Sequence, residues 1–187
     1  MLLALVTVLP VAASYFTFHV WQPQGRVNYG TLIAPTPLPA QGLPGAGGQP
    51  ALSRTELEGQ WTLLVAAPAS CEAACARALF VSRQARLAQA KELSRVGRVY
   101  LVTGAGEPAA DRLRGHEGLR LARADAAWVD ALPGADAEGG TVFLVDPLGN
   151  VMMRFADDPD TIRTARGITK DLQRLLKYSA LGRGSRE

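Results

Sequence analysis

The chain has 187 residues, of which 48% are hydrophobic, so it can bury one ordinary core and still carry a tail or an anchor. Its 20 Lys and Arg residues are interspersed with 17 Asp and Glu residues and leave a formal net charge of +3, which excludes the massed basic surface of a nucleic-acid-binding protein. Two cysteines are too few for a disulfide scaffold.

The N-terminal run "LLALVTVLPVAASYFTFHV" (2–20) contains no Lys, Arg, Asp or Glu. A helix of this length extends roughly 28 Å, close to the thickness of a bilayer's hydrocarbon core, and Trp21 follows where an interfacial aromatic residue belongs. We expect residues 1–22 to form a single-pass anchor in the inner membrane, with the C-terminal domain in the periplasm. A cleaved signal peptide, with "VAA" (11–13) at its cleavage site, and a buried soluble helix are the alternatives.

A stretch rich in Pro and Gly follows, "APTPLPAQGLPGAGGQP" (34–50). Its five prolines and four glycines disfavour a helix or a central strand. We interpret residues 23–50 as an extended segment followed by a linker, in which residues 34–50 form a semi-rigid spacer that reaches at most roughly 50 Å. Within it, "RVNYGTLI" (26–33) is a candidate for a short extended segment that packs back on the domain. The folded domain is expected over 51–178, with 179–187 as a flexible tail.

The expected domain alternates strands with helices. Short apolar runs predict strands, and these cover residues 61–67, 97–104, 118–124, 141–145 and 151–155. Stretches of good helix formers or helical periodicity predict helices, and these cover residues 71–95, 125–132 and a C-terminal segment with Asp158 as its N-cap and Pro159 as its first residue. The apolar face of the first helix is expected at Ala76, Leu79, Phe80, Leu87 and Ala90. The last two strands flank "DPLGN", a turn sequence, and are expected to form a hairpin.

The order of these elements predicts an α/β fold. A strand, a helix and a second strand imply a parallel crossover unit, and a hairpin followed by a C-terminal helix completes a thioredoxin-like sandwich. Cys71 and Cys75, in "ASCEAACA" (69–76), then lie where the first core strand runs into its helix. The helix dipole and the free N–H groups there lower a thiol pKa. A spacing of four strains a disulfide in a regular helix, so a bond between these cysteines requires an irregular first turn.

Two segments carry a resemblance to a known family. With the N-terminal anchor, "LEGQWTLLVAAPASCEAACARAL" and "TVFLVDPLGNVMMRF" resemble the Sco/SenC family over roughly residues 55–177. Its members are membrane-tethered, thioredoxin-like copper chaperones for cytochrome c oxidase assembly. The resemblance implies that Cys71 and Cys75 bind copper as Cu(I), and that the partner is a cytochrome c oxidase subunit or another copper-site protein. The CxxxC spacing is the more specific motif, because ordinary thioredoxins have CxxC.

The sequence also departs from the family pattern. The family usually has Pro after each cysteine, where this chain has Glu72 and Ala76. The family carries a copper-ligating histidine shortly before the hairpin strand, whereas "GADAEGGTVFLV" (134–145) contains none. Only His19 and His116 are present, and His116, in the loop after the second strand, is a weak candidate for a third ligand.

The cysteine pair is therefore the predicted functional site. Soft Cu(I) prefers thiolates, so Cys71 and Cys75 are expected either to bind this ion or to act in thiol–disulfide exchange on a partner's cysteines. Without the family histidine, the thiol-reductase role gains on the copper-carrier role. The alternative is a non-catalytic, tethered assembly domain in which the cysteines form only a structural disulfide. The reactive roles require two neighbouring sulfurs that solvent can reach.

Overall fold

The structure, a computed structural model, describes residues 2–19 and 28–179. The strands are β1 (Thr31–Pro37), β2 (Trp61–Pro68), β3 (Val96–Thr103), β4 (Leu119–Arg123), β5 (Val142–Val145) and β6 (Asn150–Phe155). The helices are α1 (Leu2–His19), α2 (Arg54–Leu57), α3 (Ala73–Leu87), α4 (Ala110–Leu113), α5 (Ala126–Asp130), α6 (Thr161–Tyr178) and the 3₁₀ helix η1 (Ala90–Arg95). The strands predicted from the sequence are all present, with β1 in addition.

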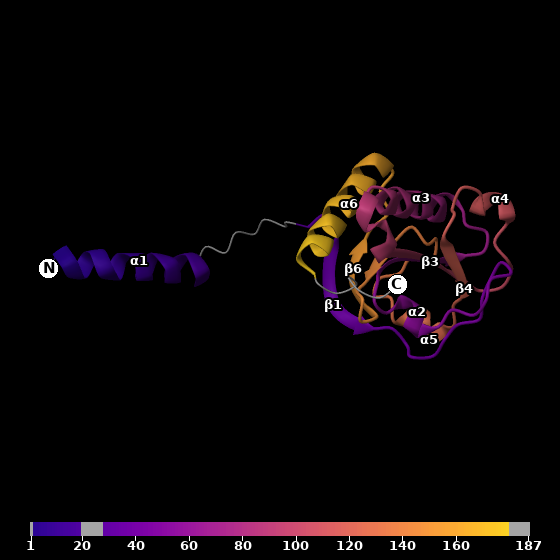
Figure 1. Ribbon diagram of the computed structural model, residues 1–187, viewed down its shortest axis with the longest axis horizontal. Coiled ribbons are helices and arrows are strands. Elements are labelled where there is room, and N and C mark those ends of the chain that lie inside the picture. Colours follow the sequence, from indigo (N-terminus) through magenta and orange to yellow (C-terminus); the bar gives the residue numbers. More distant parts are fainter. Residues whose placement is uncertain (1, 20–27, 180–187) are drawn as a thin grey trace.

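The strands form one mixed sheet in the order β1-β6-β5-β2-β3-β4 (Figure 1). β2, β3 and β4 are parallel, which confirms the predicted crossover unit, while β5 runs antiparallel to β2. The predicted hairpin is confirmed, because β5 pairs with β6 in antiparallel fashion. The architecture is the expected thioredoxin-like α/β sandwich.

The sheet is buried on both faces. In β2, Leu63 and Val65 belong to the apolar cluster beneath α3 and α6, while Leu64 and Ala66 belong to a second cluster beneath α2 and α5. Figure 1 shows these two pairs of helices on opposite sides of the sheet. Burial of both faces explains why the strand reads as a continuous apolar run instead of alternating with polar residues.

Residues 38–52, which we call the strap, close the second face of the sheet. Leu38, Leu43 and Leu52 are each 1% exposed, and the backbones of Leu43 and Leu52 form an antiparallel bridge. The interpretation of residues 34–50 as a spacer is therefore wrong. Leucines placed among turn residues give the strap apolar surface to bury, although their irregular spacing shows no helical or strand period.

The strap connects the two edges of the sheet. It follows β1, the edge strand beside β6, where the prolines are tolerated because one side of the strand makes no ladder hydrogen bonds. At its other end, Ala46 N donates to Leu121 O over 3.2 Å and Arg123 N donates to Pro44 O over 2.8 Å, so the strap covers the free edge of β4. The β4 edge is thus protected against pairing with another chain.

The chain enters the domain along α6. The Tyr29 hydroxyl lies 3.0 Å from the Thr164 hydroxyl oxygen, and Gly30 N donates to Asp171 Oδ2 over 2.9 Å. Gly167 permits this approach, because a β-carbon there would lie 2.2 Å from the Tyr29 ring. These contacts confirm, for the described part of residues 26–33, the expected extended segment that packs back on the domain.

The helix predicted over 71–95 is shorter than expected. α3 begins at Ala73 and ends at Leu87, and the helical path is interrupted at Ala90, the first residue of η1, whose φ is +49°. The apolar face also differs, because Phe80 and Leu87 are each 45% exposed. Small residues replace them at the sheet, and the buried side chains of α3 are Ala74, Cys75, Ala78, Leu79, Val81, Ser82 and Ala85.

The N-cap of α6 is Asp160, whose side chain accepts from Arg163 N over 2.9 Å. The predicted cap, Asp158, instead accepts from Asp160 N over 2.8 Å, so it braces the turn that precedes the helix. The prediction was wrong because Pro159 lies before the helix and not in its first turn.

The N-terminal run forms α1, which contains Pro10. Its described large apolar side chains are exposed, and these are Val6, Val8, Leu9, Val11, Tyr15, Phe16 and Phe18. Among residues 2–19 and 28–179, no helix has both the length and the apolarity that crossing a membrane requires. The transmembrane anchor expected within residues 1–22 is not confirmed.

Candidate functional site

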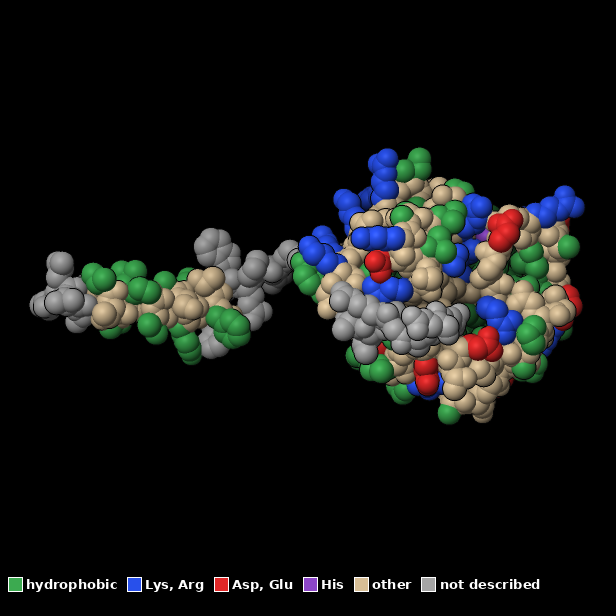
Figure 2. All heavy atoms as spheres, in the orientation of Figure 1, with side chains coloured by type: hydrophobic (Ala, Val, Ile, Leu, Met, Phe, Trp, Pro, Cys, Tyr) green, Lys and Arg blue, Asp and Glu red, His purple; other side chains and the backbone are tan. Residues whose placement is uncertain are grey.

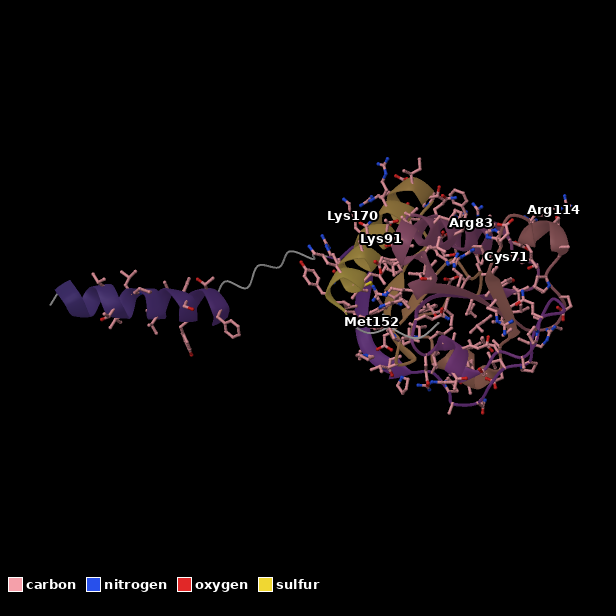
Figure 3. The ribbon with its side chains drawn as sticks, in the orientation of Figure 1. Cys71, Arg83, Lys91, Arg114, Met152 and Lys170 are labelled. Carbon is pink, nitrogen blue, oxygen red and sulfur yellow. A yellow bond between two sulfur atoms is a disulfide. The ribbon has the colours of Figure 1, made fainter. Side chains whose placement is uncertain are left out.

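Cys71 and Cys75 form a disulfide at the junction of β2 and α3, with their Cα atoms 5.1 Å apart. Cys71 precedes the N-cap residue Glu72 and has a φ of +40°, in the left-handed region, whereas Cys75 is the third residue of the helix. The irregular first turn that the spacing requires is confirmed, because one cysteine lies outside the helix. Figure 3 shows Cys71 inside the domain beside α3.

The carbonyl of Pro68 fixes the turn that holds Cys71. It accepts a hydrogen bond from Cys71 N over 3.0 Å and another from the Tyr100 hydroxyl over 2.6 Å. Burial raises the pKa of Tyr100 to about 12, so this phenol stays neutral and remains a donor. The end of β2 and the middle of β3 therefore position the first cysteine together.

Both cysteines are buried in the disulfide form. Cys71 is 1% exposed and Cys75 is 0% exposed, and both belong to the apolar cluster beneath α3 and α6. The expectation of sulfurs that solvent can reach is wrong for this state. The alanines of α3 let this helix lie close to the sheet, so the disulfide is buried between the helix and the sheet. Attack on either sulfur requires the surrounding loops to open.

One of these loops is organised by Asp136. Its carboxylate accepts from Gly140 N and from Thr141 N over 2.9 Å each, and from the Thr141 hydroxyl over 2.6 Å. Burial on its own would raise the pKa of Asp136, but the hydrogen bonds from Thr141, Gly140 and Gly139 outweigh it and hold the pKa below its ordinary value. The charged carboxylate therefore fixes the segment that leads into β5.

This loop approaches the cysteine junction too closely to admit a large side chain. A β-carbon at Gly139, whose φ is +73°, would lie 2.1 Å from Ala67 Cβ. A β-carbon at Gly140 would lie 2.7 Å from Asp157 Cβ and 3.2 Å from Ala74 Cβ. In the Sco/SenC pattern a histidine lies shortly before this hairpin strand. This chain has Gly139 and Gly140 there, and they pack against the end of β2 and the start of α3.

His116, the predicted weak third ligand, is not brought to the cysteines. Its Nδ1 lies 3.1 Å from Nη2 of Arg98, whose guanidinium contacts α3 at Leu79 and Ser82. Those residues follow Cys75 by four and seven positions, or about 6 Å and 10 Å along the helix axis. Across the described ranges, no three His, Cys, Asp or Glu side chains form a group that could hold a metal ion. The side chain of His19 lies outside the described residues.

Residues 61–179 match the profile of the family "Transmembrane-like, thioredoxin-like, C-terminal domain". The chain belongs to this family. No curated protein sequence matches the chain significantly.

Solved structures share the fold of this thioredoxin-like domain. Apo Sco1 from Thermus thermophilus has a TM-score of 0.58 and 18% identity, with 81% of this chain and 99% of that chain covered. ScoI from Bradyrhizobium japonicum, solved with copper bound, has a TM-score of 0.53 and 19% identity, with 77% and 99% covered. A putative thiol:disulfide interchange protein DsbE from Chlorobium tepidum has a TM-score of 0.56 and 18% identity, with 76% and 99% covered. The resemblance to Sco proteins seen in the sequence thus agrees with the fold.

The thioredoxin-like domain also contains an acidic residue near the site that the sequence did not single out, Asp157. Arg77 Nε donates to Asp157 Oδ1 over 2.9 Å, and Arg77 Nη2 bonds the other oxygen, so this ion pair joins α3, two residues after Cys75, to the segment before α6. Asp136 was also missed. An Asp four residues before Gly140 is a turn-forming pattern that could have indicated its role.

Proposed function

We propose that this protein is a Sco-like thiol–disulfide protein that assists the assembly of a copper site, such as that of cytochrome c oxidase. One observation carries the proposal: Cys71 and Cys75 are joined at the β2–α3 junction, with Cys71 outside the helix. At this position the reduced thiols lie at the positive end of the dipole of α3, which favours their thiolate forms. The Sco and DsbE structures that share the fold support the same general chemistry.

The proposed step is a two-electron exchange. A thiolate of the reduced pair attacks one sulfur of a disulfide in the partner, and a mixed disulfide forms as one partner thiolate leaves. The second cysteine of the pair then attacks the mixed disulfide and releases the other partner thiol. Cys71 and Cys75 end as the disulfide seen here. The partner gains two electrons and two protons, and its reduced thiols can then bind Cu(I).

Copper enters this proposal as cargo, and the residues present fit it only in part. The reduced pair offers two soft sulfur ligands, which suit Cu(I) in two-coordination. His116 is held by Arg98, and glycines occupy the loop in which the Sco/SenC pattern has a copper-ligating histidine. Because no group of three His, Cys, Asp or Glu side chains that could hold a metal ion lies among the described residues, thiol–disulfide exchange has stronger support than copper carriage.

The burial of the disulfide favours a second candidate function. If sulfurs that are 1% and 0% exposed stay covered as core atoms, the bond between them serves only to fasten the turn between β2 and α3. In that case the domain presents a surface to its partner and performs no exchange. The two candidates differ in how easily the Cys71–Cys75 bond is reduced.

An anaerobic Cu(I) titration of the reduced chain tests the part of the proposal that concerns copper. We expect one equivalent of Cu(I) to bind, with charge-transfer absorption from the thiolates, and Cys71→Ser to abolish this binding because one sulfur cannot hold the ion alone. Ser70→Ala, a change at the neighbouring exposed residue, should bind as the wild type does. Equal binding by the wild type and Cys71→Ser would place copper elsewhere and remove it from the proposal.

We also propose that the domain works outside the cytoplasm, in the periplasm, and is held at the membrane by its N-terminal segment. The absence of Lys, Arg, Asp and Glu from residues 2–20 supports this location. So does the disulfide, because such bonds persist in oxidising compartments and are rare in the cytosol. Cell fractionation checks the proposal, which predicts that the protein is found with the membranes and that an external thiol reagent labels it after reduction.

A further inference from the structure

Arg98 is a buried arginine whose hydrogen-bond partners among the described residues are all neutral. It is 2% exposed, on β3, where it pairs with Leu63 of the neighbouring strand. Its Nη2 donates to Leu79 O over 2.8 Å, its Nε lies 3.3 Å from the Ser82 hydroxyl oxygen, and its third partner is Nδ1 of His116. A guanidinium so deep in the protein ordinarily has an anionic partner, because burying an unpaired charge is costly.

The charges around Arg98 add to the imbalance. Burial, together with the positive charges of Arg86 and Arg83, lowers the pKa of Arg98 to about 10. Arg86 is held by its Nε, which donates to Val96 O over 2.6 Å, and burial lowers its pKa too. Arg83, on α3 (Figure 3), lies 3.9 Å from the exposed carboxylate of Glu117. Within residues 28–179, neither Arg86 nor Arg98 has a carboxylate within ion-pair distance.

A pocket of about 300 Å³ opens beside Arg86 and Arg98, at the start of β2 and β3. Residues that line it include Glu56, Gln60, Arg86, Ser94, Arg98 and Arg120. The single carboxylate among them is already engaged, because Glu56 and Arg120 form an ion pair of 3.0 Å. The charges of Arg86 and Arg98 are therefore not balanced by the pocket's own residues. Figure 2 shows blue Lys and Arg side chains spread over the viewed face, with red Asp and Glu side chains between them.

We propose that this pocket binds a compact oxyanion, a phosphate, sulfate or carboxylate group, whose negative charge faces Arg86 and Arg98. Guanidinium groups offer planar pairs of donors that match the oxygens of such groups. The site lies at the opposite end of β2 from the cysteine junction, so it is independent of the proposed exchange chemistry. The anion would complete the charge balance of the fold at this end of the sheet.

The ring of His116 reports on the site. Burial and the charges of Arg98 and Arg83 lower the pKa of His116, while Glu117 acts in the opposite direction. An anion beside Arg86 and Arg98 would weaken the positive field, and the titration midpoint of His116 would rise. NMR titration of the full chain follows this ring, with phosphate, sulfate or acetate added at an ionic strength matched by NaCl.

The expected result is a saturable upward shift of the His116 midpoint with at least one oxyanion and none with matched chloride. The anion that acts at the lowest concentration identifies the preferred class, since acetate tests carboxylates and phosphate and sulfate test tetrahedral oxyanions. Arg86→Gln should abolish the response, whereas Arg112→Gln on α4 should retain it. No saturable shift with any of the three anions in the wild type would overturn the proposal. An unchanged response in a folded Arg86→Gln protein would do so as well.

Discussion

At the residue scale, the site depends on a few hydrogen bonds that hold charged or strained groups in place. Cys71 adopts a positive φ because Pro68 O accepts its N–H, and Tyr100 donates to the same carbonyl. Asp136 fixes the loop before β5 through bonds to Gly140 and Thr141. Without these bonds, neither the turn nor the loop would keep its place against the cysteine pair.

Asp136→Asn tests the role of the carboxylate. We expect a loss of about 1 kcal/mol in the free energy of unfolding at pH 7, or about 4 °C in Tm, since a charged acceptor of several hydrogen bonds is replaced by a weaker neutral one. The folded pKa of Asp136 is lowered, so its contribution is present above about pH 3.9 and is lost as pH falls through the folded pKa. The difference between the two proteins should therefore shrink in acid, as measured by thermal melts from pH 7 to pH 3.

Asp130→Asn at the exposed end of α5 serves as the matched control and should leave Tm unchanged within about 1 °C. A difference between Asp136→Asn and the wild type that stays constant down to pH 3 would show that the charge of Asp136 has no part in holding the loop.

At the element scale, the strap covers one face of the sheet and its β4 edge. Residues 38–52 run from the β1 edge to the β4 edge and bury three leucines on the way. The strap also covers the face of the sheet opposite α3 and α6, so the second apolar cluster depends on it. A domain that began at residue 51 would expose that cluster, and we expect it to be poorly stable.

Leu43→Ala tests this contribution. Leu43 is 1% exposed and belongs to the second apolar cluster, so its truncation should lower the free energy of unfolding by about 2–5 kcal/mol. Leu148→Ala removes the same atoms from a side chain that is 58% exposed, in the turn between β5 and β6, and should change stability by less than about 0.5 kcal/mol. Denaturant unfolding of both variants measures the difference. If both lose the same free energy of unfolding, the strap does not contribute to the core.

The sequence predicted those elements whose signal is local. The continuous apolar run of β2, the turn "DPLGN" and the helical periodicity of α6 each identify an element without knowledge of its neighbours. The strap was missed because its Pro and Gly residues indicate irregular structure, and only tertiary contacts show that Leu38, Leu43 and Leu52 are buried.

The candidate site was predictable only in part, for the same reason. The CxxxC motif located the disulfide and required an irregular turn, both of which the structure shows. The burial of the two sulfurs depends on how closely α3 and the loop at Gly139 and Gly140 approach β2, and no spacing in the sequence records that distance. Asp157 acts through Arg77, a partner 80 residues away in the chain, so it has no motif of its own.

At the scale of the whole molecule, the protein is a closed thioredoxin-like sandwich with a disulfide in its interior. Such a scaffold can act on a partner only if the loops beside the junction open, because the sulfurs are covered in the state described. The reactive account predicts that this opening costs little and that the reduced form is accessible. The alternative account makes the bond part of the core, in which case it resists reduction.

The equilibrium reduction potential of the Cys71–Cys75 pair separates these accounts most directly. The full chain is equilibrated in glutathione or dithiothreitol buffers of known potential, and the fraction of free thiol is read from alkylation by mass spectrometry. The reactive account predicts a midpoint between roughly −180 and −270 mV, the range of proteins that exchange disulfides. A midpoint below about −300 mV, typical of structural disulfides, would contradict it.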